Sequence, residues 1–175
     1  MSSVENHQAR VVVTGLNAKG RSTIVADENS STRVVTPTFA VADVWRVDRI
    51  PAPVLADNPL NGDVILDPPK GGLLVRTVAF PPDSEWKAGG GYAEAMAAIS
   101  GAGSHDESDA VAGMHATDTV DIGTVISGEI YAVMQDGEVL LRPGDSFVQR
   151  GTKHAWSNRS DKPAVLVVTQ VSALR

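Results

Sequence analysis

The chain has 175 residues, no cysteine and a formal net charge of −6 at neutral pH. A chain of this length suits one domain that buries about 70% of the surface exposed by its unfolded form. The absence of cysteine excludes disulfides and thiolate ligands, so a bound metal would need nitrogen and oxygen ligands. The negative charge and the scattered basic residues argue against a nucleic-acid partner.

Residues 1–9 form a polar leader that contains His7. They lack the basic segment and the apolar run of a signal peptide. No apolar stretch approaches the roughly 20 residues that are needed to span a bilayer. We therefore expect a cytoplasmic protein that has neither a membrane nor a nucleic acid as its partner.

Short β-rich runs separated by turn residues follow the leader. In the N-terminal part, residues 10–85, these runs are residues 10–16, 22–26, 32–36, 39–47 and 73–80. Val, Ile, Thr and aromatic side chains suit a pleated, half-buried surface, so the pattern predicts a β-sandwich or barrel. Because apolar edge strands invite pairing, we expect a two-fold homodimer that forms through these N-terminal strands.

One stretch differs from the strands around it. The sequence YAEAMAAIS, residues 92–100, is alanine-rich, places Tyr92 and Met96 four residues apart and is followed by Gly101. This pattern predicts a short helix, which we expect to lie against the barrel. Residues 86–112 thus combine a helix with flexible flanks. The part from 87 to 112 is either a flap over a site or an exposed insertion without a role.

Polar side chains alternate in GMHATDTVD, residues 113–121, at the start of the C-terminal third. On an extended strand His115, Thr117, Thr119 and Asp121 would share one face. Such a column is a metal site, a substrate site or a solvated edge. Further strands are predicted at residues 124–134, 138–141, 146–150 and 164–171, with a tight turn at Asp136-Gly137 and a type II turn at Pro143-Gly144.

Two motifs in residues 113–158 carry a family resemblance. The first is GMHATDTVDIGTVISG, and the second is PGDSFVQRGTKHAWSN, in which His154 lies four residues before Asn158. Together they resemble the cupin superfamily. The resemblance implies an all-β fold, a cupin barrel (double-stranded β-helix or jelly roll) with extra N-terminal strands and one short helix. Residues 10–175 would then form a single cupin domain, with the cupin motifs in residues 113–171.

The resemblance is incomplete at the metal-binding positions. Thr117 stands where cupins have the second histidine of a His-x-His pair, and Asp121 replaces a glutamate. What remains is His115, Asp121 and His154, which implies a two-histidine, one-carboxylate set for a divalent metal (Fe, Mn, Zn or Ni) with open coordination positions. The alternative is that both histidines are buried imidazoles bonded to main-chain carbonyls or to Asp121.

A substrate pocket is predicted around the second motif, where Phe147, Gln149 and Trp156 could line it together with Thr117. The resemblance implies a metal-dependent enzyme of small-molecule metabolism that acts on a small oxygenated acid, ketone or phenolic compound, as a dioxygenase, decarboxylase or isomerase. Two alternatives are a non-catalytic cupin that binds a small molecule, and a metal-free epimerase or dehydratase in which a histidine works with Asp121.

Overall fold

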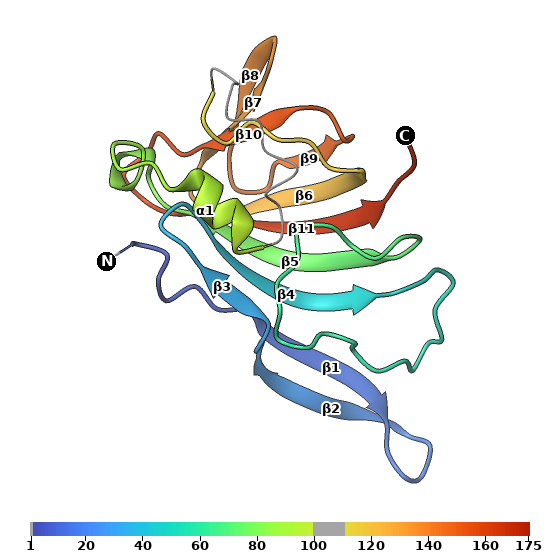
Figure 1. The fold of residues 1–175 in the computed structure, drawn as a ribbon. Coiled ribbons are helices and arrows are strands. Elements are labelled where there is room, and N and C mark those ends of the chain that lie inside the picture. The colour runs from blue at the N-terminus through green and yellow to red at the C-terminus, as the bar shows by residue number, and fades with distance from the viewer. Residues whose placement is uncertain (1, 100–110) are drawn as a thin grey trace.

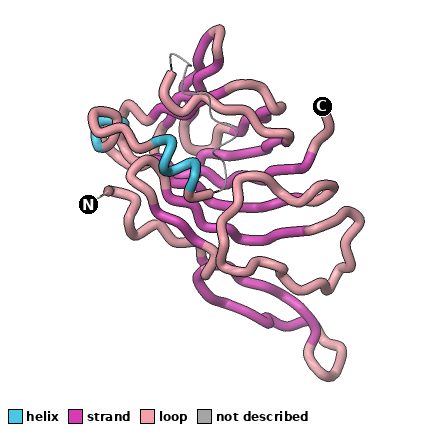
Figure 2. The backbone as a smooth tube through the Cα atoms, viewed as in Figure 1, coloured by secondary structure: helices cyan, strands magenta, loops and turns pink. Residues whose placement is uncertain are grey.

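The computed structural model describes residues 2–99 and 111–175, and their backbone is mostly β-strand with one short α-helix (Figures 1 and 2). The elements are β1 (Arg10–Leu16), β2 (Ser22–Asn29), β3 (Arg33–Val35), β4 (Ala40–Val47), β5 (Leu73–Phe80), the 3-10 helix η1 (Asp83–Glu85), α1 (Tyr92–Ala97), β6 (Thr119–Ser127), β7 (Ile130–Met134), β8 (Gly137–Leu141), β9 (Ser146–Gln149), β10 (His154–Ser157) and β11 (Ala164–Ser172).

Two antiparallel sheets form the body of the protein. The larger has the strand order β3-β4-β5-β11-β6-β9, and the smaller has the order β10-β7-β8. Apolar side chains from the two sheets pack into a shared core that includes Val125, Leu166 and Val168 from the larger sheet and Ile130, Ala132 and Leu141 from the smaller. The predicted all-β cupin barrel is confirmed.

The strands at the centre of the larger sheet alternate as a half-buried sheet requires. On β11, Leu166, Val168 and Gln170 are buried, whereas the residues between them are only half-buried. On β6 the buried side chains include Asp121, which lies directly opposite Gln170 in the register of the two strands. Because alternation sends every second side chain inward, it brings these two polar residues into the barrel together with the apolar ones.

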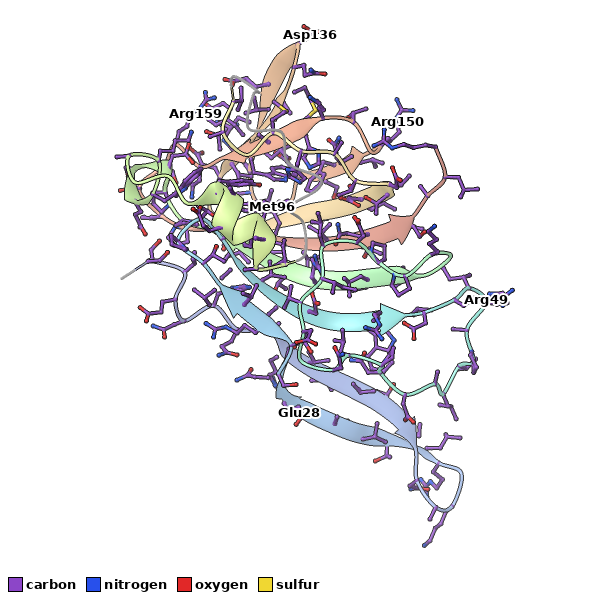
Figure 3. All side chains as sticks on the ribbon, viewed as in Figure 1. Glu28, Arg49, Met96, Asp136, Arg150 and Arg159 are labelled. Carbon is purple, nitrogen blue, oxygen red and sulfur yellow. The ribbon has the colours of Figure 1, made fainter. Side chains whose placement is uncertain are left out.

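Helix α1 covers one half of the larger sheet, and Figure 3 shows Met96 on the helix above the strands. Met96, Ala95 and Ile99 are buried against Phe39 and Val41 of that half. The helix predicted at residues 92–100 is therefore confirmed over residues 92–97. The segment 100–110 lies outside the described residues, so the interpretation of residues 87–112 as a flap stays a prediction.

The predicted strand at residues 124–134 is in fact two strands, β6 and β7, that separate at Gly128. Gly128 has a φ of +68°, and a Cβ on it would lie 2.3 Å from the carbonyl oxygen of Pro163. Only glycine fits this close approach, so the chain turns there from the larger sheet to the smaller one. The expected type II turn is present at Pro143-Gly144, where Asp145 donates its N–H to the Arg142 carbonyl at 2.9 Å.

The N-terminal leader packs on the body although its composition is polar. Val4 is buried with Ala40 and Ala79, and the His7 Nε2 lies 2.9 Å from the Thr77 hydroxyl. Within residues 2–99 and 111–175, no helix is long and apolar enough to cross a membrane.

Candidate functional site

A cavity of about 80 Å³ lies inside the barrel, between the larger sheet, strand β10 and helix α1. Aromatic side chains form much of its wall, among them Phe80, Phe147 and Trp156. The rings of Phe147 and Trp156 have centroids 4.8 Å apart. The polar residues that also line it are Arg76, His115, Asp121, His154 and Gln170. The cavity is therefore apolar, with one concentrated polar side.

His115 and His154 face each other across an isolated β-bridge. Each donates its backbone N–H to the other's carbonyl at 2.9 Å, and the two rings have centroids 4.4 Å apart. Nδ1 of His115 lies 2.8 Å from the Gly113 carbonyl, and Nδ1 of His154 lies 2.9 Å from the Thr152 carbonyl. Because a carbonyl oxygen only accepts, Nδ1 of each ring carries a proton, and the lone pair of the neutral ring is on Nε2.

The Asp121 carboxyl group is buried on the same side of the cavity. The side chains of Thr119 and Gln170 hydrogen-bond to it, and the Thr117 hydroxyl is 2.7 Å from that of Thr119. Its Oδ1 nevertheless has no hydrogen-bond partner among the described residues. Burial raises the pKa of Asp121, an effect that these hydrogen bonds and the charges of Arg76 and His115 oppose.

Burial lowers the pKa of His154, whereas its hydrogen bond to the Thr152 carbonyl acts in the opposite direction. Burial thus favours the neutral form of His154, which can accept a proton, and the protonated form of Asp121, which can donate one. Both residues line the same cavity. Such opposed protonation preferences are typical of acid–base sites.

Arg76 forms a buried ion pair that the sequence analysis did not identify. Its Nε donates to Asp43 at 2.9 Å, and its terminal nitrogens donate to the carbonyls of Ile65 and Leu66 at 2.6 and 3.3 Å. The signal that could have revealed it is an arginine in the apolar strand LLVRTVAF, at a position that alternation turns inward. The same reasoning applies to Gln170 in AVLVVTQV.

The predicted pocket residues divide into two groups. Phe147 and Trp156 line the cavity, and the Phe147 ring has room because Gly123 lies opposite it; a Cβ on Gly123 would be 2.3 Å from the ring. Gln149 differs from the prediction, since its amide donates to the Thr152 carbonyl at 2.9 Å and braces the turn before His154. Thr117 likewise bonds to Thr119 and does not line the cavity.

The predicted metal ligands His115, Asp121 and His154 all line the cavity. In residues 2–99 and 111–175, however, no three His, Cys, Asp or Glu side chains form a group that could hold a metal ion. The donor set present here therefore does not fit a complete three-ligand centre, although the unpartnered Oδ1 of Asp121 would suit a cation. Metal binding by these residues stays a prediction.

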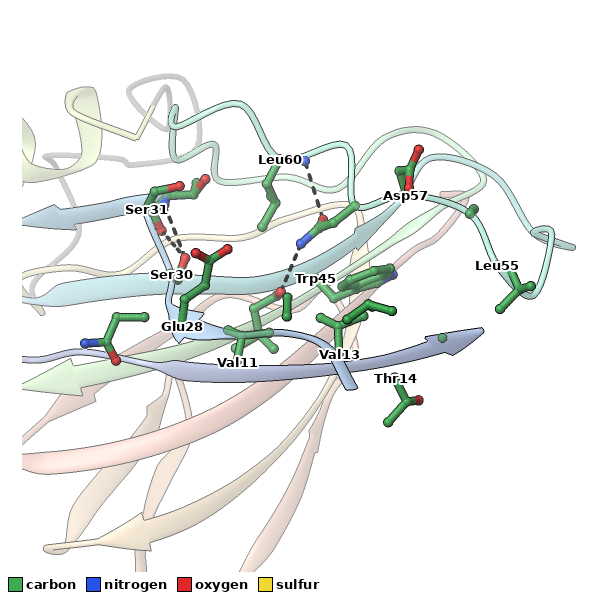
Figure 4. A pocket seen from close by; sticks show the side chains of 18 of the residues that line it. Val11, Val13, Thr14, Glu28, Ser30, Ser31, Trp45, Leu55, Asp57 and Leu60 are labelled. Atoms are coloured by element: carbon green, nitrogen blue, oxygen red, sulfur yellow. Dashed lines mark hydrogen bonds between the residues drawn. The ribbon is translucent and has the colours of Figure 1, made fainter. Parts of the chain in front are cut away.

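A second concavity lies on the outside of the barrel and shares no lining residue with the first. This groove, of about 580 Å³, runs between the β1–β2 hairpin and the segment that follows β4 (Figure 4). Its lining includes Val11, Val13, Trp45, Leu55 and Leu60. No histidine among the described residues lines this groove. We therefore assign the candidate catalytic site to the inner cavity.

Residues 105–170 match the family model of the cupin domain. A stretch of 48 residues is 52% identical to the phomopsin biosynthesis cluster protein C′ of Diaporthe leptostromiformis and covers 27% of this chain and 25% of that protein. Another of 47 residues is 51% identical to the oryzines biosynthesis cluster protein J of Aspergillus oryzae and covers 26% of each chain. A longer match of 152 residues, with 24% identity, covers 83% of this chain and 64% of the cupin-domain-containing oxidoreductase srdD of Neurospora crassa.

The chain thus spans between 25% and 64% of the length of these relatives. Among solved structures, KdgF from a Halomonas species is similar over 79% of this chain and 83% of its own, with 16% identity and a TM-score of 0.44. A cupin-superfamily protein from Desulfitobacterium hafniense is similar over 79% of this chain and 82% of its own, with 9% identity and a TM-score of 0.43.

Proposed function

Because this chain is a member of the cupin superfamily, we propose that its inner cavity is the active site of an enzyme of small-molecule metabolism. The enzyme transfers protons on a small oxygenated compound, as an isomerase, epimerase or dehydratase does. The names of two relatives, which refer to the biosynthesis of phomopsin and oryzines, support a role in small-molecule chemistry.

The observation that carries this proposal is that an imidazole and a buried carboxyl group line one largely apolar cavity, where burial raises the pKa of Asp121 and lowers that of His154. His154 acts as the base, since its Nδ1–H is bonded to the Thr152 carbonyl and its Nε2 lone pair is available for a proton. Asp121 acts as the acid, since burial raises its pKa. In the reaction His154 takes a proton from a carbon next to a carbonyl group, and Asp121 gives its proton to the carbonyl oxygen, so that an enol forms.

The experiment is proton exchange in deuterated water. Chelator-dialysed protein is incubated with a panel of small ketones and hydroxyketones, and NMR follows the replacement of C–H by C–D. We expect exchange with the wild type and a loss of about 100-fold or more in His154→Gln, because a positioned base contributes on that order. Asp121→Asn should also lose rate, since it cannot donate the proton.

His7→Gln is the control, because His7 lies in the leader and contacts Thr77 outside the cavity. It should exchange at the wild-type rate. A wild-type protein that exchanges no faster than buffer with every compound of the panel contradicts the proposal.

A metal-dependent oxidoreductase is the second candidate. It is favoured by the unpartnered Oδ1 of Asp121 and by relatives that are named oxidoreductases. Elemental analysis of protein purified without a histidine tag separates the two candidates. Metal near one equivalent, lost in Asp121→Asn and retained or raised in Thr117→His, supports the second candidate; metal well below one equivalent in all three proteins supports the first.

A further inference from the structure

Gln170 is a buried residue of the cavity wall with an unused hydrogen-bond acceptor. The residue is 5% exposed, it lines the cavity, and its Oε1 has no hydrogen-bond partner among the described residues. A buried amide oxygen without a partner costs free energy, so an unused one next to a cavity is a position where a ligand can supply the donor.

The Gln170 amide lies beside the Asp121 carboxyl group. The two residues are directly opposite each other on β11 and β6, and Gln170 is among the groups that act on the pKa of Asp121. Within the described residues, Oε1 is the atom of this amide that is buried without a partner. The polar side of the cavity therefore presents an amide acceptor beside the carboxyl group.

The charges around the cavity disfavour an anionic ligand. Arg76 is the permanently charged cation among the described lining residues, and each of its three guanidinium nitrogens already donates to a protein oxygen, with Asp43 as its ion-pair partner. A ligand carboxylate would thus enter a largely apolar cavity beside the Asp121 carboxyl group and find no uncommitted permanent cation among these lining residues, which is costly. The ligand that fits is neutral.

We propose that Gln170 is a specificity-determining residue whose Oε1 accepts a hydrogen bond from a hydroxyl group of a small neutral substrate, so that the enzyme takes hydroxy-carbonyl compounds and rejects carboxylates. The inference rests on the proposed function and names its substrate class. The volume of about 80 Å³ limits the ligand to a handful of heavy atoms, since an engineered cavity of about 150 Å³ holds one benzene molecule.

Three probes that share an acetyl group test this inference: hydroxyacetone, butanone and pyruvate. They carry a hydroxymethyl group, an ethyl group and a carboxylate. Binding to the wild type is followed by the NMR shift of the Trp156 indole N–H, because Trp156 lines the cavity. We expect hydroxyacetone to bind about fivefold more tightly than butanone, the effect of one hydrogen bond, and pyruvate to bind most weakly.

Gln170→Leu keeps the side-chain volume and removes the acceptor. It should bring the hydroxyacetone affinity down to that of butanone and leave butanone unchanged within about twofold, because butanone makes no bond to Oε1. Gln149→Leu is the matched control. It removes a buried glutamine whose amide bonds to Thr152, so the preference for hydroxyacetone should persist.

Two results would overturn the inference: tighter binding of pyruvate or butanone than of hydroxyacetone by the wild type, or an unchanged preference in Gln170→Leu. The comparison of the three probes on the wild type tests the inference even if Gln170→Leu fails to fold. These measurements report binding alone, so the expected preference without any proton exchange would refute the proposed reaction and leave the role of Gln170 standing.

Discussion

At the scale of single residues, Asp121 is the side chain whose environment says most about the site. It is buried, its hydrogen bonds come from neutral partners, Thr119 and Gln170, and one of its oxygens is without a partner within the described residues. Burial favours the protonated acid and outweighs the hydrogen bonds, which favour the carboxylate. The same carboxyl group would be stabilised as an anion if a metal ion were its natural neighbour.

Asp121→Asn therefore tests the protonation state through stability. The folded-state pKa of Asp121 is raised above its unfolded value near 3.9, so its contribution to stability is complete below pH 3.9 and is lost as the pH rises through the folded-state pKa. We expect the Asn variant to gain stability relative to the wild type between pH 4 and pH 7, by about 1.4 kcal/mol per unit of the pKa difference. Urea unfolding at both pH values measures this.

The opposite trend, an Asn variant that loses stability relative to the wild type as the pH rises to 7, would mean that the carboxylate is stabilised by a cation. His7→Gln provides the background control, because burial lowers the pKa of His7 and its titration does not involve the cavity.

At the scale of elements, the approach of β9 to β6 creates the aromatic wall of the cavity. Phe147 on β9 lies directly opposite Gly123 on β6, and its ring occupies the space that a side chain on Gly123 would fill. A glycine inside a strand weakens it, so its presence here is explained by the close approach of the ring.

Gly123→Ala should consequently destabilise the protein by about 1–3 kcal/mol, the usual cost of overpacking, because the new Cβ would lie 2.3 Å from the Phe147 ring. Phe147→Leu in the same chain should remove part of that cost. The unfolding free energies of the two single variants and the double variant form a cycle. Additive effects, with no coupling between the two positions, would disprove the steric explanation.

At the scale of the whole molecule, the β1–β2 hairpin extends from one side of the body as an arm (Figure 1). Its strands pair with each other in a separate two-stranded sheet, and Val12, Leu16, Ile24 and Val25 are exposed on it. A two-stranded hairpin is marginally stable alone, and exposed apolar side chains on it mark an interaction surface. Of these four residues, Leu16 and Val25 also line the groove between the arm and Trp45 (Figure 4).

The homodimer predicted from the N-terminal strands is accordingly expected to use this arm. Light scattering at micromolar concentration should give the mass of two chains, and Ile24→Asp should shift it towards one chain because a charge would be buried in the interface. Val139→Asp is the control, since Val139 is similarly exposed but lies on β8, which Figure 1 shows far from the arm. A monomer mass for the wild type would refute the dimer.

The local elements and the two motifs can be predicted from the amino-acid sequence alone. Residues 73–80 were predicted as a strand and form β5 with the same limits, and the alanine-rich stretch forms α1. These features depend on neighbours a few residues apart, so composition and alternation reveal them. The strand β10 was missed, because HAWS is too short to show a pattern. Five of the seven predicted site residues line the cavity, namely His115, Asp121, Phe147, His154 and Trp156.

The residues that share the cavity with these five become apparent from the folded structure. Arg76 and Gln170 join His115 and Asp121 because β11 lies between β5 and β6 in the larger sheet, with Gln170 in register with Asp121. Alternation in a sequence tells which side chains face inward, but it carries no information about which strands become neighbours or how they align. Strand order and register depend on hydrogen bonds and core contacts between segments far apart in the chain, and these exist only in the folded protein.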